Sequence, residues 1–467
     1  MDSLYRLRHL DLDDKMCHQV SLDVLEHVYP RACIAEQLSL HQAWGERERI
    51  LNMVLVIHLL LAAALWTRLA LPRVLERLAR PLHLLGLPVL LMQVRGSAIS
   101  YRRQQLGVAP LQGLFARCCQ PLCTPETPGA YRFGKRLMAL DGTMQDMPDT
   151  PANAAAFARP SNQYGPGPFP QLRLLALSEC GSHAIVDATI SDSTQAERRL
   201  AEQLVPSLTS DMFLLHDAQF TGLRFWQAVR ARGAQVMGPL PSHHLPTYLR
   251  QLSDGSYLAV YTPSSQQARE GIKPLVVRVI EYRITDVRLG EPEQRYRLAT
   301  TWLNPRTAPA LALIECYHER WEVEVVMDEI KTHQRLQQPV LRSRTPDGVR
   351  QEIYALLLAH YAVRAMMYEA ATQAAVDPDR LSFTDAVFVL SETTRELAQV
   401  HPAQQEAIRQ EMYARLTAQL LPPRRLRTNP RVLKKLYRKY PRKPQNMPPV
   451  PPFDPTARFL DFVVLLI

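Results

Sequence analysis

The stretch from residue 131 to residue 232 constrains the fold of this 467-residue chain more than any other part. Short apolar runs typical of β-strands alternate there with segments of helical spacing. Two of these runs, Arg136–Leu140 and Met212–Leu215, lead to the acids Asp141 and Asp217. Strands, helix, strand and helix in this order predict an α/β core with a mixed sheet, in which carboxylates stand at the ends of strands.

The character of the sequence changes on both sides of that stretch, and the changes predict five regions. Helical spacing with intervening Pro and Gly predicts an all-helical N-terminal domain over residues 1–125. The α/β core then occupies 126–234 and 306–375, and a β-rich insertion at 235–305 separates its two parts. Residues 376–467 are expected to form a C-terminal helical region and a basic, Pro-rich tail.

One apolar segment, Ile50–Trp66, must be weighed as a membrane span. It is apolar apart from Asn52 and His58, and charged residues close it on both sides. A membrane-spanning helix needs about 20 residues, which is longer than this segment. We therefore expect a buried helix and no membrane association.

The cysteines indicate a reducing compartment. The chain has seven, an odd number without the spacing of a disulfide framework, and its acidic N-terminus does not resemble a signal peptide. We therefore expect a cytoplasmic protein. Cys118, Cys119 and Cys123 lie close together, but no fourth ligand of the usual type is nearby, so free thiols are favoured over a zinc site.

Positive charge is concentrated near the C-terminus. The formal net charge is +10, and residues 424–443 contain ten Lys or Arg and no acid. This excess predicts a polyanionic partner, either nucleic acid or an anionic membrane surface. If the partner is DNA, five of these cations, interleaved with tyrosines, would follow its backbone: Arg431, Lys434, Lys435, Arg438 and Lys439.

The segment Tyr317–Lys331 combines side chains that suit phosphodiester chemistry. Read as one continuous helix at about 100° per residue, it places four of them within a sector about 60° wide: Tyr317, Arg320, Glu324 and Lys331. A carboxylate can hold a divalent metal, and Arg, Lys and Tyr can bind phosphates. Asp328 projects to almost the same side, and helical geometry alone does not separate it from Glu324.

Asp141, Asp217 and Glu324 together are candidate ligands for two Mg²⁺ ions. Such ions, about 3.5–4 Å apart, would relieve the repulsion between three carboxylates and activate water for attack on phosphorus. Each acid also has a purely structural interpretation. Asp141 can belong to a turn with Gly142, Asp217 can cap a helix, and Glu324 can lie on a solvated helix face.

The spacing Tyr-x2-Arg-x3-Glu-x6-Lys resembles the signature of bacterial insertion-sequence transposases, in the insertion-sequence-four group of DDE enzymes. Residues 138–143 and 214–217 resemble the segments that carry the first and second acids of this group. The resemblance covers about residues 130–365, and residues 20–110 look like the N-terminal domain of the same proteins. One departure follows the second acid, where Ala218-Gln219 replaces the usual Arg-Gly.

This resemblance implies a ribonuclease-H-like core in which Asp141, Asp217 and Glu324, rather than Asp328, bind two Mg²⁺ ions, with Mn²⁺ as a substitute. Tyr317, Arg320 and Lys331 would grip phosphates at the scissile end. The implied activity is cut-and-paste transposition: cleavage at the transposon ends, typically through a hairpin, and strand transfer into target DNA.

The implied partners are the terminal inverted repeats and the target DNA, bound by a homodimer in the synaptic complex. The N-terminal helices would serve end recognition or dimerisation, in a protein associated with the bacterial nucleoid. Two other functions stay open from the sequence. One is a ribonuclease-H-like DNA nuclease without strand transfer, and the other is a catalytically inactive DNA-binding regulator.

Overall fold

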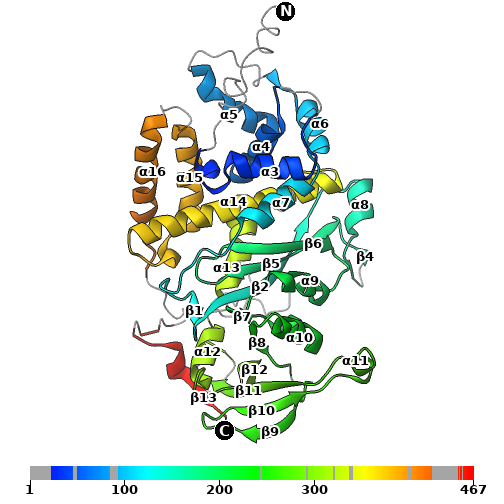
Figure 1. Ribbon diagram of the computed structural model, residues 1–467, viewed down its shortest axis with the longest axis vertical. Coiled ribbons are helices and arrows are strands. Elements are labelled where there is room, and N and C mark those ends of the chain that lie inside the picture. Colours follow the sequence, from blue (N-terminus) through cyan, green and yellow to red (C-terminus); the bar gives the residue numbers. More distant parts are fainter. Residues whose placement is uncertain are drawn as a thin grey trace, which may run out of the picture. The chain divides into compact units, whose positions relative to one another are not determined.

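The chain divides into two compact units in a computed structural model, coloured along the sequence in Figure 1. The first unit comprises Met1–Tyr131, Arg136–Ser207 and Trp321–Leu421, and the second comprises Arg132–Lys135, Leu208–Arg320 and Pro422–Ile467. The structure describes residues 23–45, 50–84, 93–162, 165–241, 244–290, 293–318, 321–335, 340–397, 402–422 and 451–466, the last without Pro452 and Pro455.

The regular elements among the described residues of the N-terminal part of the first unit are all helices. Its helices are α2 (Asp23–Val28), α3 (Arg31–Leu40), α4 (Met53–Leu65), α5 (Leu71–Leu84), α6 (Gly96–Leu106) and α7 (Ala109–Cys118). Asn52 caps α4 by accepting a hydrogen bond from the Leu55 N–H at 2.8 Å. Because twelve of the thirteen residues of α4 are buried, the prediction of a buried helix is confirmed. None of the described helices is both long and apolar enough to cross a membrane.

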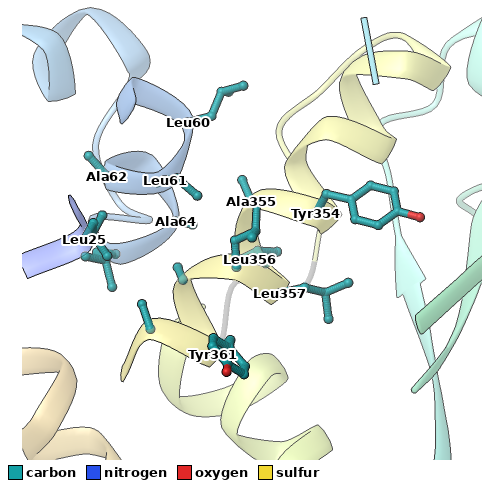
Figure 2. Close-up of a cluster of buried hydrophobic side chains, with 14 of the residues drawn as sticks. Leu25, Leu60, Leu61, Ala62, Ala64, Tyr354, Ala355, Leu356, Leu357 and Tyr361 are labelled. Carbon is teal, nitrogen blue, oxygen red and sulfur yellow. The ribbon is translucent and has the colours of Figure 1, made fainter. Parts of the chain in front are cut away.

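The longest helix, α14 (Pro346–Gln373), forms the centre of the first unit. Figure 2 shows Leu61 and Ala64 of α4 facing Ala355 and Leu356 of α14. Thr345 caps the start of the helix. Its other faces contact α7, β6 (Ile185–Asp192), α15 (Phe383–Leu397) and α16 (Pro402–Thr417), so that most of its residues are buried. In Figure 1 it passes between the N-terminal helices and the strands of this unit.

Three antiparallel strands of the first unit lie in the order β6–β5–β2, where β2 is Lys135–Asp146 and β5 is Gln171–Glu179. The sequence prediction that the first strand ends at Asp141 is wrong. β2 continues to Asp146, with Asp141 opposite Ala176 of β5. The extension is held by pairing with β5, which continues on both sides of Asp141 from Met138 to Asp146. Short elements accompany the strands: β1 (Tyr131–Arg132), α8 (Pro151–Phe157), β3 (Ser161–Asn162), β4 (Gly165–Pro166), α9 (Glu197–Leu204) and η4 (Val205–Ser207).

The second unit contains the strands β7 (Met212–Leu215), β8 (Gln235–Pro239), β9 (Thr247–Gln251), β10 (Tyr257–Tyr261), β11 (Leu275–Ile284) and β12 (Tyr296–Thr300). β7 and β8 are parallel, and β8–β12–β11–β10–β9 are antiparallel in that order. Its helices are η5 (Ala218–Phe220), α10 (Leu223–Ala231), α11 (Ser265–Arg269) and α12 (Ala310–His318). The apolar C-terminal residues form η8 (Phe459–Phe462) and β13 (Val463–Leu465), which pairs with β11. The chain is thus a mixed α/β protein.

Candidate active site

Asp141 lies in the middle of β2, where its side chain is half-buried. The Gly142 N–H donates to its Oδ1 at 2.8 Å. Gly142 itself pairs with Leu175 of β5, so the alternative interpretation of Asp141 as a turn residue is wrong. A carboxylate held within a paired strand has a fixed backbone position, which suits a ligand of a catalytic ion.

Asp217 follows the buried strand β7 after one residue, as the sequence predicts. Its Oδ1 accepts a hydrogen bond from the Gln219 N–H at 2.9 Å and caps η5. The alternative interpretation, in which Asp217 caps the helix that begins near Gly222, is therefore wrong, because Gly222 is the N-cap of α10 and Asp217 caps only the short turn η5. One oxygen of the carboxylate can serve the cap while the group still presents acceptor capacity, because an ionised carboxylate offers about four lone-pair sites.

His216 holds the backbone on which Asp217 stands. Its ring is fully buried, and the Trp226 indole N–H donates to His216 Nε2 at 2.9 Å. Because Nε2 accepts, the ring proton is on Nδ1, which donates to the Asp217 carbonyl at 2.7 Å. Gly238 of β8 leaves space for this ring, since a Cβ there would lie 2.1 Å from His216 Cε1. No motif or spacing in the sequence indicates this role for His216, which depends on contacts with Trp226 and Gly238.

Contrary to the sequence prediction, the Tyr-Arg-Glu-Lys signature is not regular α-helix as far as Lys331, because residues 329–334 form a π-helical turn. Tyr317 is on α12 of the second unit, and its hydroxyl donates to the His216 carbonyl at 3.2 Å. Glu324 is on α13 (Trp321–Asp328) of the first unit, and its side chain lies outside the described part. Arg320 also lies outside the described residues, as do the five cations expected to follow DNA: Arg431, Lys434, Lys435, Arg438 and Lys439.

A π-helical turn, η6 (Glu329–Gln334), follows α13 and contains Lys331. A π turn closes hydrogen bonds from i to i+5 and is wider than an α turn. The spacing of about 100° per residue therefore does not apply between Glu324 and Lys331. The prediction that Lys331 lies on the same helix face as Glu324, within a sector about 60° wide, is therefore wrong. The Lys331 side chain is nevertheless exposed and available to an anion.

The segment after η6 is attached to the strand of the first acid. The Arg335 guanidinium donates to the Gln145 side chain, and the Leu341 N–H donates to the Asp146 carbonyl at 2.9 Å. Asp146 and Val340 also form a parallel β-bridge. Within the first unit, the chain that continues from the Glu324 helix is thus tied to β2.

Trp302 packs against aromatic side chains of the second unit. Its ring makes edge contacts with Phe133 and Phe213, with centroids 5.4 Å and 5.6 Å away. Its indole N–H donates to Thr307 Oγ1 at 2.8 Å. Trp302 is therefore a packing residue of this unit.

The three acids are chemically suited to a hard divalent cation. Carboxylate oxygens are the ligands that Mg²⁺ and Mn²⁺ prefer. Asp141 and Glu324 belong to the first unit, and Asp217 belongs to the second. Among the side chains that the structure describes, no group of three or more His, Cys, Asp or Glu is arranged to hold a metal ion.

Two family models match the chain. Residues 132–362 match the transposase DDE domain, and residues 19–116 match the N-terminal domain of insertion element 4 transposases. The first match includes Asp141, Asp217 and Glu324, and the second coincides with the N-terminal helices.

Curated relatives point in the same direction. The chain is 29% identical over 355 residues to transposase InsG for insertion sequence element IS4 of Escherichia coli K12, covering 75% of this chain and 79% of that protein. It is also 29% identical over 136 residues to the putative transposase InsZ of the same organism, covering 27% of this chain and 42% of the relative. A piggyBac transposase synaptic complex with hairpin DNA shares 84% coverage of both chains at 11% identity, with a TM-score of 0.44 that is too low to establish a common fold.

Proposed function

We propose that this chain, which belongs to the insertion-sequence-four family of DDE transposases, cleaves DNA at the ends of its insertion sequence and transfers the freed strands into target DNA. That it is a DNA transposase follows from the family. The observation that carries the cut-and-paste reaction is the order of acids within the DDE match, with Asp141 on β2, Asp217 one residue after β7 and Glu324 on α13.

A ribonuclease-H-like core is proposed for the parts that carry these acids. The antiparallel strands β6–β5–β2 and the parallel pair β7–β8 support it. We retain the proposed division into an N-terminal domain (1–125), a split core (126–234 and 306–375), an insertion (235–305) and a C-terminal region (376–467). The strands β9 to β12 fall within the proposed insertion.

In this reaction Asp141, Asp217 and Glu324 would hold two Mg²⁺ ions, or Mn²⁺ in their place. When bound, the ions would lower the pKa of a water molecule and stabilise charge on phosphate oxygens. The chain's own contribution is to fix the ligands: β2 pairing holds Asp141, and the η5 cap and His216 hold Asp217. Water attack would release a 3′-hydroxyl, which would attack the opposite strand to form a hairpin and, after resolution, join target DNA.

Cations are proposed to bind the DNA backbone around this centre. Arg320 and exposed Lys331 would contact phosphates at the scissile end. The tail cations Arg431, Lys434, Lys435, Arg438 and Lys439 would follow the duplex, and a homodimer would bring two transposon ends together. In a bacterial cell such a protein would associate with the nucleoid. Tyr317 would act near the same phosphates while its hydroxyl steadies the Asp217 backbone.

The proposed function is tested by Glu324→Gln, with Asp328→Asn as the matched control. Both acids are on α13, and Asp328 accepts a hydrogen bond from Thr332 Oγ1 at 2.5 Å. With Mg²⁺ and DNA carrying the cognate ends, we expect Glu324→Gln to lose cleavage and strand transfer while Asp328→Asn keeps both. Full activity of Glu324→Gln would refute the assignment. Cleavage without integration of pre-cleaved ends would identify a nuclease, and specific binding without any cleavage would identify a regulator.

A further inference from the structure

A buried ionic cluster lies directly after the helix that carries Glu324. Glu329, the first residue of η6, is bound by the Arg364 guanidinium, whose Nε donates to Oε2 at 3.1 Å and whose Nη2 donates to Oε1. His360 Nε2 lies 2.9 Å from Glu329 Oε2. His183 completes the cluster, because its Nδ1 accepts a hydrogen bond from Arg364 Nη2 at 2.8 Å.

These four residues come from three separate parts of the first unit. His360 and Arg364 are one turn apart on α14, Glu329 begins η6, and His183 is in the turn between β5 and β6. His183 has a backbone φ of 59°, the left-handed region that costs energy for a residue with a Cβ. The surrounding contacts hold it there, with Asp379 Oδ1 lying 3.4 Å from its Nε2.

The cluster is excluded from water, so its charges depend on one another. The four side chains are between 0% and 4% exposed. Burial alone would raise the pKa of Glu329, but the Arg364 charge and the His360 hydrogen bond outweigh burial and hold that pKa well below its usual value. Burial lowers the pKa of His360, so His360 is neutral and donates to an ionised Glu329. Removing one member of such a pair leaves the other charge buried without compensation.

The far end of the π turn is anchored independently. Gln334 Nε2 donates to the Leu356 carbonyl at 3.0 Å, and the Gln334 carbonyl accepts a hydrogen bond from Thr67 Oγ1 at 3.2 Å. Arg335 is tied to Gln145 of β2. Because this end is fixed, conversion of the π turn to an α turn would shift the preceding helix α13 by one residue relative to η6 and β2. Glu324 would then rotate by about 100° and move by about 1.5 Å along the helix axis.

We propose that Glu329, Arg364, His360 and His183 are positioning residues that lock η6 in its π-helical register and thereby set the place of Glu324. This inference rests on the proposed function, in which Glu324 is a ligand of the catalytic ions. The cluster touches neither DNA nor reacting atoms. It acts through α13, and a displacement of about 1 Å at a catalytic group can cost about 100-fold in rate.

The test compares Glu329→Gln with Glu281→Gln as the matched control. Glu281 is likewise a buried carboxylate with an arginine partner, Arg295, and a hydroxyl donor, Tyr257 at 2.9 Å, but it is on β11 of the second unit. Hydrogen exchange is measured for the amides of residues 321–334 at a temperature well below unfolding. We expect exchange there to accelerate about tenfold or more in Glu329→Gln, and to be unchanged in Glu281→Gln. Equal exchange in wild type and Glu329→Gln would overturn the proposal.

Cleavage kinetics give the second readout. At saturating DNA and Mg²⁺, Glu329→Gln is expected to lower the single-turnover rate by about 100-fold while DNA affinity stays within about twofold. If Glu329→Gln does not fold, His360→Leu replaces it, because leucine has no hydrogen-bond donor for Glu329 and the change removes no charge. The same two readouts then decide the proposal.

A double variant separates positioning from stability. Glu329→Gln with Arg364→Met removes both charges, and such replacements often restore stability. We expect the double variant to regain thermal stability while cleavage stays slow. Recovery of both would show that the cluster only stabilises the fold, and would overturn the proposal. Failure of the proposed function would look different, since Glu324→Gln would then cleave normally while the exchange result would still stand.

Discussion

The Tyr317 hydroxyl donates a hydrogen bond to the His216 carbonyl across 101 positions of sequence, with 3.2 Å between the two oxygens. His216 directly precedes Asp217 and is itself held by Trp226 and packed against Gly238. The tyrosine of the signature is therefore coupled to the backbone of the second acid. Sequence spacing alone suggested only a phosphate contact for it.

Replacing Tyr317 by Phe tests this coupling. The variant loses one hydrogen bond, worth about 1 kcal/mol, and is expected to slow cleavage at saturating DNA by about three- to tenfold with unchanged DNA affinity. Tyr261→Phe is the control, because the Tyr261 hydroxyl also makes one side-chain hydrogen bond, to His244 at 3.0 Å. Weaker DNA binding at an unchanged cleavage rate would instead identify Tyr317 as a phosphate ligand alone.

Gly238→Ala should destabilise the support of Asp217. The added Cβ would lie 2.1 Å from His216 Cε1, so the ring or the strand β8 must move. Overpacking of this kind costs about 1–3 kcal/mol, measurable as a lower melting temperature, and it should also lower the cleavage rate. Gly96→Ala is the control, since the nearest atom to its added Cβ would be 3.6 Å away. An unchanged melting temperature in Gly238→Ala would contradict the packing described for His216.

His58 in α4 should make the protein sensitive to acid. Burial lowers the pKa of His58 from 6.5 to about 3, so the unfolded chain takes up a proton below pH 6.5 that the folded chain does not bind. The stability contributed by neutral His58 is complete above the pKa of the unfolded chain, 6.5. It is lost as the pH falls from there towards about 3, the pKa of His58 in the folded protein. The loss reaches about 2 kcal/mol at about pH 5.

His58→Leu removes that proton uptake. Unfolding midpoints measured between about pH 7 and about pH 5 should therefore decrease less in the variant than in wild type. Parallel pH profiles for the two proteins would show that His58 is not the group responsible.

The tail cations should determine the salt dependence of DNA binding. Replacing Arg431, Lys434, Lys435, Arg438 and Lys439 by glutamine should reduce the slope of log K against log salt by about 0.9 for each lost phosphate contact. Binding isotherms at several salt concentrations measure this slope. An unchanged slope would mean that these cations only increase solubility.

The sequence by itself determined the features that depend on local periodicity and covalent spacing. A continuous apolar run with an Asn cap specifies α4, and a short apolar run followed by Asp217 specifies β7 and its acid, because side-chain pattern and backbone geometry are coupled within a few residues. The spacing of the Tyr-Arg-Glu-Lys signature also indicated the family, because residue spacing can be compared between sequences without knowledge of the fold.

Only the tertiary structure decided which partners distant residues find. Asp141 continues a strand because β5 pairs with residues on both sides of it, and no local signal reports that pairing. Glu329 looks like one more acid on a solvated helix, yet it is buried because Arg364, His360 and His183 approach it from α14 and the β5–β6 turn. Burying a charge is favourable only when partners compensate it, and those partners are assembled by folding rather than by sequence proximity.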